Sequence, residues 1–404
     1  MKKSKFRATV VILLLTVGFY LKSGCENLNQ YKIVGNNPVF CFHNDTVAVV
    51  SSKVIKAIGN YVSEGNYDTD LELQLFNTSG YELKKLSIKT PTYYDIPVGL
   101  VETPCKYILL YHANAVSFSQ GMHGWGELRI IDKATLRVES TDSSIAEEPS
   151  GVFLLNDSSF VIGTTVIRSN NDIEYHLICK SIHGNLLWEK YFPGSIGAGD
   201  FNGGQYSFKP SKLGITNQFY FPMRNYKSGN NPFDVKYRTW TTRVLFMDFS
   251  GHLTKVDSSE NSYVRNITYL SDGKRVEVVT RNSTTLQLTL LLYKNREFQD
   301  SIILSDSLKG MFDFSFMNES DTLISALTSS VSCEVSFRSF IIRKGKFEEI
   351  SSSTVKSSQL GNYCVSQTAF FESKSRLGVF YVAIPGGRRD PTEPISDLFS
   401  EFLN

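Results

Sequence analysis

The sequence lacks an excess of either charge and has few tryptophans and cysteines. Its 42 Lys and Arg nearly balance its 40 Asp and Glu, so no basic excess favours binding to a nucleic-acid backbone. Its 6 cysteines include no C-x-x-C pair, which argues against zinc and thioredoxin-like sites. We expect most of them, including Cys41 and Cys179, to be small buried hydrophobic residues, with at most two disulfides overall.

Long apolar runs are also absent beyond the first 25 residues, and this one run predicts export. A positive segment (2–7) precedes an apolar stretch (8–21). That stretch is shorter than the ~20 residues of a membrane span and fits the core of a signal peptide. Residues 22–25 (Lys-Ser-Gly-Cys) resemble the lipobox of bacterial lipoproteins, which makes Cys25 the expected lipidation site, although Lys22 departs from the usual aliphatic residue. Ordinary secretion and an uncleaved anchor are the alternatives.

A polar turn between two apolar runs recurs seven times in the chain. Asn, Asp, Ser and Gly favour such turns because their side chains bond to the local backbone or permit positive φ. The turns lie at Asn44–Asp45, Glu102–Pro104, Asn156–Asp157, Thr216–Gln218, Asp272–Gly273, Asn318–Glu319 and Glu372–Lys374.

A second kind of hairpin alternates with the first. Each of its six copies joins an apolar strand to a more amphipathic one, which is typical of strands that move outward from a core. The copies cover residues 73–86, 128–138, 177–191, 244–256, 288–304 and 340–350.

Two hairpins per repeat predict an all-β fold, a single β-propeller of four-stranded blades over residues 26–390. The strand count favours seven blades, with six as the alternative. We expect the N-terminal strand, near residues 31–34, to complete the last blade. Residues 391–404 place Ile395 and Phe399 on one helical face, which predicts a short amphipathic helix after the ring.

The turn Ser271–Arg275 (SDGKR), with its relatives at Asn156 and Asn318, resembles the repeats of TolB-like propellers. The match extends over most of the chain as a pattern but over few residues in each blade. The resemblance implies an exported β-propeller lipoprotein of the cell envelope that acts as a binding protein.

Motifs of other propeller classes are absent. The sequence has no sialidase-type aspartate box, no tryptophan-aspartate dipeptide and no tandem-Gly kelch signature, and it has too few tryptophans for a quinone-dependent dehydrogenase. A G-x-S-x-G nucleophile turn is missing too. We therefore expect a non-catalytic binding or scaffold propeller. The alternative is a glycan hydrolase or lyase with paired carboxylates near the ring axis.

Three long segments are expected to share one face of the ring and to carry the ligand site: 113–126, 193–205 and 224–240. Their aromatic and basic side chains suit a glycan, a peptide or a partner protein of the envelope. The candidate ligand-binding residues are Arg224, Tyr226, Lys227, Tyr237, Arg238, Trp240, His123 and Trp125.

No cofactor or metal site is expected. His123, Glu127 and the nearby His112 lack the spacing of a metal site. The segment 200–204 (DFNGG) begins like a calcium loop but offers only two oxygen ligands at alternate positions.

Overall fold

The computed structural model describes the strands of the chain and most of their short turns. The described residues are 29–31, 36–43, 45–57, 67–90, 95–113, 125–145, 148–167, 173–193, 211–212, 217–226, 240–261, 264–281, 287–305, 311–319, 322–329, 334–355, 363–373, 376–385 and 397–403. None of these residues is helical, so none of them belongs to a helix that could cross a membrane.

The described strands form seven antiparallel sheets of four strands each, which we number as blades 1 to 7. From the innermost strand outward, blade 1 consists of β2 (Asn36–His43), β3 (Thr46–Ala57), β4 (Tyr67–Asn77) and β5 (Glu82–Ile88). Blade 2 consists, in the same order, of β6 (Ile96–Glu102), β7 (Lys106–Ala113), β8 (Trp125–Asp132) and β9 (Val138–Ile145). Blade 3 consists of β10 (Glu148–Asn156), β11 (Ser159–Ile167), β12 (Ile173–Ser181) and β13 (Leu186–Pro193). Blade 4 consists of β14 (Ser211–Lys212), β15 (Gln218–Tyr226), β16 (Trp240–Asp248) and β17 (Leu253–Ser259). Blade 5 consists of β18 (Val264–Tyr269), β19 (Arg275–Arg281), β20 (Gln287–Lys294) and β21 (Glu297–Ser305). Blade 6 consists of β22 (Met311–Glu319), β23 (Thr322–Ser329), β24 (Val335–Arg343) and β25 (Lys346–Val355). Blade 7 consists of β26 (Tyr363–Ser373), β27 (Arg376–Pro385), β28 (Asp397–Leu403) and β1 (Asn29–Tyr31).

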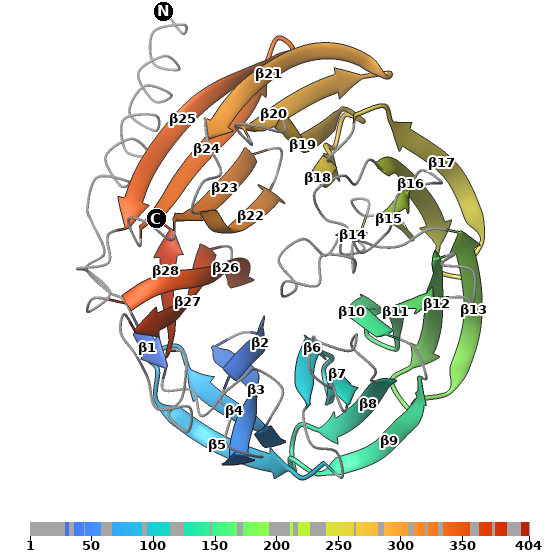
Figure 1. Ribbon diagram of the computed structural model, residues 1–404, viewed down its shortest axis with the longest axis vertical. Coiled ribbons are helices and arrows are strands. Elements are labelled where there is room, and N and C mark those ends of the chain that lie inside the picture. Colours follow the sequence, from blue (N-terminus) through green and yellow to red (C-terminus); the bar gives the residue numbers. More distant parts are fainter. Residues whose placement is uncertain are drawn as a thin grey trace, which may run out of the picture.

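The blades are arranged as a closed ring (Figure 1). The first strand of each blade lies at the centre and the fourth at the rim. The predicted all-β propeller of four-stranded blades is therefore confirmed, and the seven sheets agree with the favoured blade count. Both predicted kinds of hairpin are present: strands 1 and 2 are consecutive in all seven blades, and strands 3 and 4 are consecutive in blades 1 to 6.

The N-terminal strand completes the last blade. β1 pairs with β28, so that Asn29, Gln30 and Tyr31 lie opposite Ser400, Phe399 and Leu398. This pairing is the predicted closure, formed slightly earlier in the chain than residues 31–34.

The helix predicted over 391–404 is wrong, because residues 397–403 form β28 and belong to the ring. In residues 397–403, Leu398 with Phe402 and Phe399 with Leu403 are each four positions apart, a spacing that places each pair on one side of a helix and also on one face of a strand. Pairing with β27 on one side and β1 on the other satisfies its backbone, and this tertiary context decides between the two patterns. Residues 391–396 lie outside the described part.

Strand β7 shows why the inner strands are apolar on both faces. Its residues are all buried. Ile108 and Leu110 belong to a core shared with blade 3, whereas Leu109 and Tyr111 belong to a core shared with blade 1. Successive side chains point to opposite faces of a strand, so one strand serves two blade interfaces. The outermost strand β5 is instead exposed at most positions.

The strand order gives the ring two distinct faces. We call the end with the turns between strands 1 and 2 and between strands 3 and 4 the turn face. The opposite end, the loop face, carries the connections between strands 2 and 3 and those from one blade to the next. First strands run from the loop face to the turn face, and the later strands alternate in direction.

Candidate functional site

The three segments proposed from the sequence begin and end at the loop face. Ala113 at the end of β7 lies opposite Trp125 at the start of β8, and Tyr226 lies opposite Trp240 in the same way. Pro193, at the end of β13, precedes a connection between blades. The topology therefore brings the flanks of all three segments to the same end of the ring, while most of each segment lies outside the described residues.

The structure places only part of the proposed ligand-binding set. Arg224 and Tyr226 are at the end of β15, and Trp240 begins β16, but their side chains lie outside the described part. The remaining predicted residues outside the described part are Cys25, His123, Lys227, Tyr237 and Arg238.

Trp125 is the one member of this set with a described side chain, and a hydrogen-bond network fixes it. Its indole Nε1 donates to Glu127 Oε1 at 3.3 Å. The buried Glu127 also accepts from Ser143 Oγ at 3.0 Å, from Arg129 Nη2 at 3.2 Å and from the Tyr111 hydroxyl. Four donors on one carboxylate hold Trp125 half-buried at the edge of the loop face.

His112 does not join this network. It lies opposite Gly126 in the sheet. Because successive side chains point to opposite faces, the His112 side chain lies on one face of blade 2, and the side chains of Trp125 and Glu127 lie on the other. Within the described residues, no three His, Cys, Asp or Glu side chains are grouped so that they could hold a metal ion. Cys179 is buried, which raises the pKa of its thiol to about 12, and it packs in the core between blades 3 and 4.

Glu148 is the acidic residue that starts the innermost strand of blade 3, at the loop face. It is partly buried. Burial raises the pKa of its carboxyl group to about 7. The chain thus places a carboxyl group that is half protonated near neutral pH at the inner edge of the loop face.

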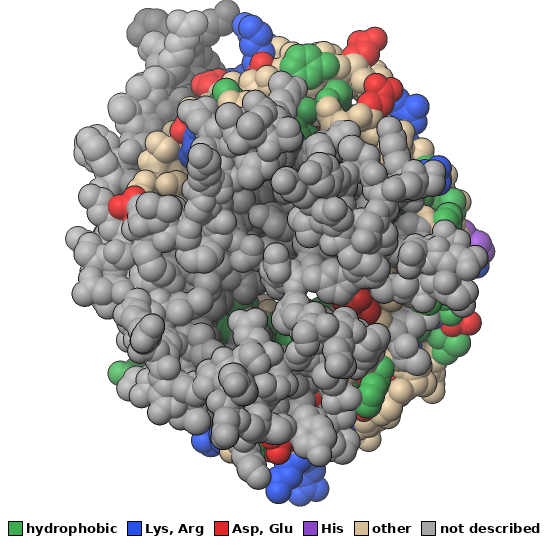
Figure 2. Space-filling model, viewed as in Figure 1, with side chains coloured by type: hydrophobic (Ala, Val, Ile, Leu, Met, Phe, Trp, Pro, Cys, Tyr) green, Lys and Arg blue, Asp and Glu red, His purple; other side chains and the backbone are tan. Residues whose placement is uncertain are grey.

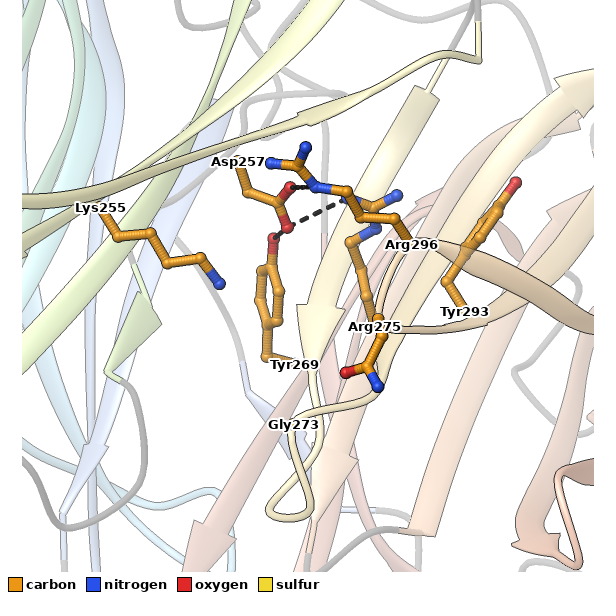
Figure 3. A pocket seen from close by; sticks show the side chains of 8 residues that line it. Lys255, Asp257, Tyr269, Gly273, Arg275, Tyr293 and Arg296 are labelled. Carbon is orange, nitrogen blue, oxygen red and sulfur yellow. Dashed lines mark hydrogen bonds and ion pairs between the residues drawn. The ribbon is translucent and has the colours of Figure 1, made fainter.

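A pocket of about 230 Å³ opens between blades 4 and 5, at the turn face (Figure 3). The outermost strand of blade 4 lines one side, and the first three strands of blade 5 with two of its turns line the other. The lining residues are Lys255, Asp257, Tyr269, Gly273, Arg275, Tyr293, Asn295 and Arg296.

The buried Arg275 forms the floor of this pocket. Its Nη1 donates to Asp257 Oδ2 at 3.1 Å and to the carbonyl of Ser258 at 3.0 Å. Its Nε lies 3.0 Å from Oε1 of the fully buried Glu277. The guanidinium group lies over the ring of Tyr293, 5.0 Å from its centroid. One buried cation thus pairs with two buried carboxylates, Asp257 from blade 4 and Glu277 from blade 5.

Asp257 is saturated with donors. Its Oδ2 accepts from the Tyr269 hydroxyl at 3.0 Å as well as from Arg275. Its Oδ1 accepts from the backbone N–H of Ser258 at 2.9 Å and lies 3.3 Å from Nε of Arg296. Burial pulls the pKa of Asp257 upward, but the backbone N–H of Ser258 and the charge of Arg275 outweigh it, so the pKa lies below its usual value. Burial, together with the nearby Asp257 charge, raises the pKa of Tyr269, so the hydroxyl stays protonated and donates.

The sequence did not indicate this pocket. The turn Ser271–Arg275 stood out only as a mark of repeat structure, and no sequence pattern pointed to Lys255 or Arg296. The basic and acidic residues of the pocket come from two blades, so only the packing of those blades shows that they meet.

The surface seen in Figure 2 carries no large patch of one charge among the described side chains. Lys and Arg are mixed with Asp and Glu around the rim. This mixture agrees with the near balance of charge in the sequence.

Comparison with known proteins identifies similar folds. No family model matches the sequence, and no curated protein matches it. Among solved structures, the chain is similar to the Dos1 propeller, with 12% identity, a TM-score of 0.49 and 96% of each chain covered. It is also similar to the C-terminal WD40 domain of Sif2, with 9% identity, a TM-score of 0.40 and coverage of 92% of this chain and 98% of that one. A third similar structure is the Trypanosoma rangeli sialidase, with 6% identity, a TM-score of 0.42 and coverage of 95% of this chain but 58% of that one. The seven four-stranded sheets arranged in a ring show by themselves that the chain is a β-propeller.

The raised pKa of Glu148 predicts a pH-dependent stability difference. The unfolded chain loses this proton near pH 4.5, whereas the folded chain holds it up to about pH 7. The free energy of unfolding therefore falls as the pH rises between these values. Glu148→Gln removes this loss, so the variant should match the natural protein near pH 4 and exceed it at pH 8 by up to about 3 kcal/mol.

Urea unfolding from pH 4 to pH 8 measures this difference. Glu297→Gln, at an exposed position on β21, controls for the general effect of removing one negative charge. Equal stability of Glu148→Gln and the natural protein at pH 8 would contradict the assignment.

Proposed function

We propose that this protein is an exported, lipid-anchored binding or scaffold propeller that recognises a glycan, a peptide or a partner protein through its loop face. The observation that carries the proposal is the common position of the three long segments, whose flanking strands all end at that face. Long connections gathered on a rigid frame are the usual place for recognition.

The buried carboxylates of Glu72, Glu127 and Glu277 already accept hydrogen bonds or form ion pairs within the protein, which supports binding rather than catalysis. Glu72 accepts from Lys53 at 3.2 Å and from Ser87 at 3.0 Å, and Glu127 and Glu277 are held by the contacts described above. A glycosidase site needs two carboxyl groups flanking one bond. In the described part, these three acids are bound to their own blades or to residues of the adjoining one.

The alternative, a glycan hydrolase or lyase, rests on Glu148. A carboxyl group with a pKa of about 7 has the protonation that a general acid needs, and it lies on an innermost strand. The innermost strands carry four other acidic residues, of which Asp313, Glu319 and Glu372 have side chains outside the described part. The fourth, Glu102, pairs with Lys133 at the opposite, turn-face end. Among the described side chains of the innermost strands, the enzyme alternative therefore rests on Glu148 alone.

The path of β1 supports an anchor at Cys25. β1 is the fourth strand of its blade and runs from the turn face to the loop face. Only residues 26–28 separate Cys25 from Asn29, so the distance between these two residues is at most about 14 Å in a fully extended chain. A lipid on Cys25 would therefore hold the membrane on the turn-face side of blade 7 and leave the loop face directed away from it.

A labelling experiment tests the anchor. In a bacterial host supplied with labelled palmitate, the natural protein should incorporate the label and enter the detergent phase on Triton X-114 partition. Cys25→Ser should do neither, because it lacks the thiol that would carry the lipid. The exposed cysteine variant Cys105→Ser should behave like the natural protein. Label retained by Cys25→Ser, or absent from the natural protein, would contradict the anchor.

A glycan and peptide binding screen tests the loop face. Tyr and Trp are enriched among the energetic centres of interfaces, so Tyr237→Ala and Trp240→Ala should each weaken binding of the selected ligand by about tenfold or more. Tyr81→Ala is the matched control, because Tyr81 is 72% exposed and lies at the turn face. Unchanged affinity in both loop-face variants would remove the segment 224–240 from the site, and a loss in Tyr81→Ala alone would move the site to the turn face.

A further inference from the structure

The pocket between blades 4 and 5 is separate from the proposed recognition site. It opens at the turn face, on the far side of the ring from the loop face. Its floor of Asp257, Arg275 and Glu277 is buried and internally paired, as described above. The groups available to a ligand are therefore the two cations at its rim, Lys255 and Arg296.

Lys255 directs an unpaired charge toward the pocket. Figure 3 shows its ammonium group pointing into the space beside Tyr269. The group lies 5.0 Å from the centroid of the Phe246 ring, and no described carboxylate lies within ion-pair distance of it. An exposed ammonium group with three donors can bind an anion without first breaking an ion pair.

Arg296 forms one exposed ion pair, and breaking that pair to bind a ligand would lose little free energy. Its Nε pairs with Asp257 at 3.3 Å, but its side chain is 68% exposed. Exposed ion pairs contribute about 0–1 kcal/mol, and Asp257 keeps its other donors when Arg296 moves. The Nη groups of Arg296 have no partner among the described residues and present the planar fork that suits a carboxylate.

The backbone holds Arg296 at this rim. Asn295 and Arg296 are the two residues of the turn between β20 and β21, and both have positive φ, 52° and 70°. Positive φ at both residues is the geometry of a type I′ hairpin turn. Asn295 also lines the pocket, where its amide adds a neutral polar group.

The charges and the size of the pocket indicate the class of ligand. The cations Lys255, Arg275 and Arg296 outnumber the two carboxylates by one, so a monoanion would neutralise the site. The volume of about 230 Å³ is below the range of drug-sized sites, and the lining is polar. We propose that the pocket binds a small hydroxylated monocarboxylate, such as a single sugar acid, with the carboxylate between Lys255 and Arg296.

Calorimetry on the full ring with D-glucuronate tests this proposal, with D-glucose as the neutral probe and inorganic phosphate as the other oxyanion. Glucuronate should bind, and glucose should not. Arg296→Gln and Lys255→Gln should each weaken glucuronate binding by about tenfold, the effect of losing a hydrogen bond to a charged group. Both positions are exposed, and thermal unfolding checks that the variants fold.

Arg343→Gln is the matched control. Arg343 is an exposed arginine beside the corresponding turn of blade 6, where it pairs with Glu348 at 3.2 Å. It should leave glucuronate binding unchanged. Equal binding of glucose, absence of glucuronate binding, an equal loss in Arg343→Gln, or phosphate binding tighter than glucuronate at Arg296 would each overturn the proposal. None of these results depends on the loop face, so they are independent of the recognition proposed there.

Discussion

Three pairs of facing residues between β1 and β28 join the two ends of the chain, and the ring depends on them. Without β1, the last blade would have three strands, and β28 would be its outermost strand. With β1 in place, residues near the N-terminus and the C-terminus share one sheet, and the chain between them must close on itself. Closure is the reason that a propeller exposes only short strand edges.

A closed ring means that every blade has a neighbour on both faces, and the interfaces differ in character. Between blades 3 and 4 the contact is aromatic: Trp188 stacks near Phe219 and donates to the carbonyl of Phe249 at 3.0 Å. Gly251, with a φ of +83°, lies so close that a Cβ atom there would come within 2.7 Å of the indole. Between blades 4 and 5 the outer part is instead the charged floor around Arg275. The apolar interface needs tight packing, whereas the charged one leaves a pocket at its mouth.

Local patterns predicted the hairpins well, because a turn and its two strands are adjacent in the sequence. The seven turns near residues such as Asn156 and Asp272 all lie between strands 1 and 2 of a blade. The tail was predicted wrongly because its spacing fits a helix as well as a strand, and only its partners β27 and β1 decide. Contacts such as those of Arg275 with Asp257, or of Trp188 with Gly251, join different blades. Neither residue of such a pair indicates the other, so the pocket could not be predicted from the sequence.

A designed disulfide across the closure tests the ring most directly. Asn29 and Ser400 are partners in the register, and facing residues of antiparallel strands have Cα separations that a disulfide accommodates. The account predicts that Asn29→Cys with Ser400→Cys gives an intramolecular cross-link between the two termini on oxidation, found by peptide mapping without reduction. Asn29→Cys with Glu401→Cys, one residue out of register, should cross-link poorly. Equal cross-linking in both variants, or none in the first, would contradict the closure.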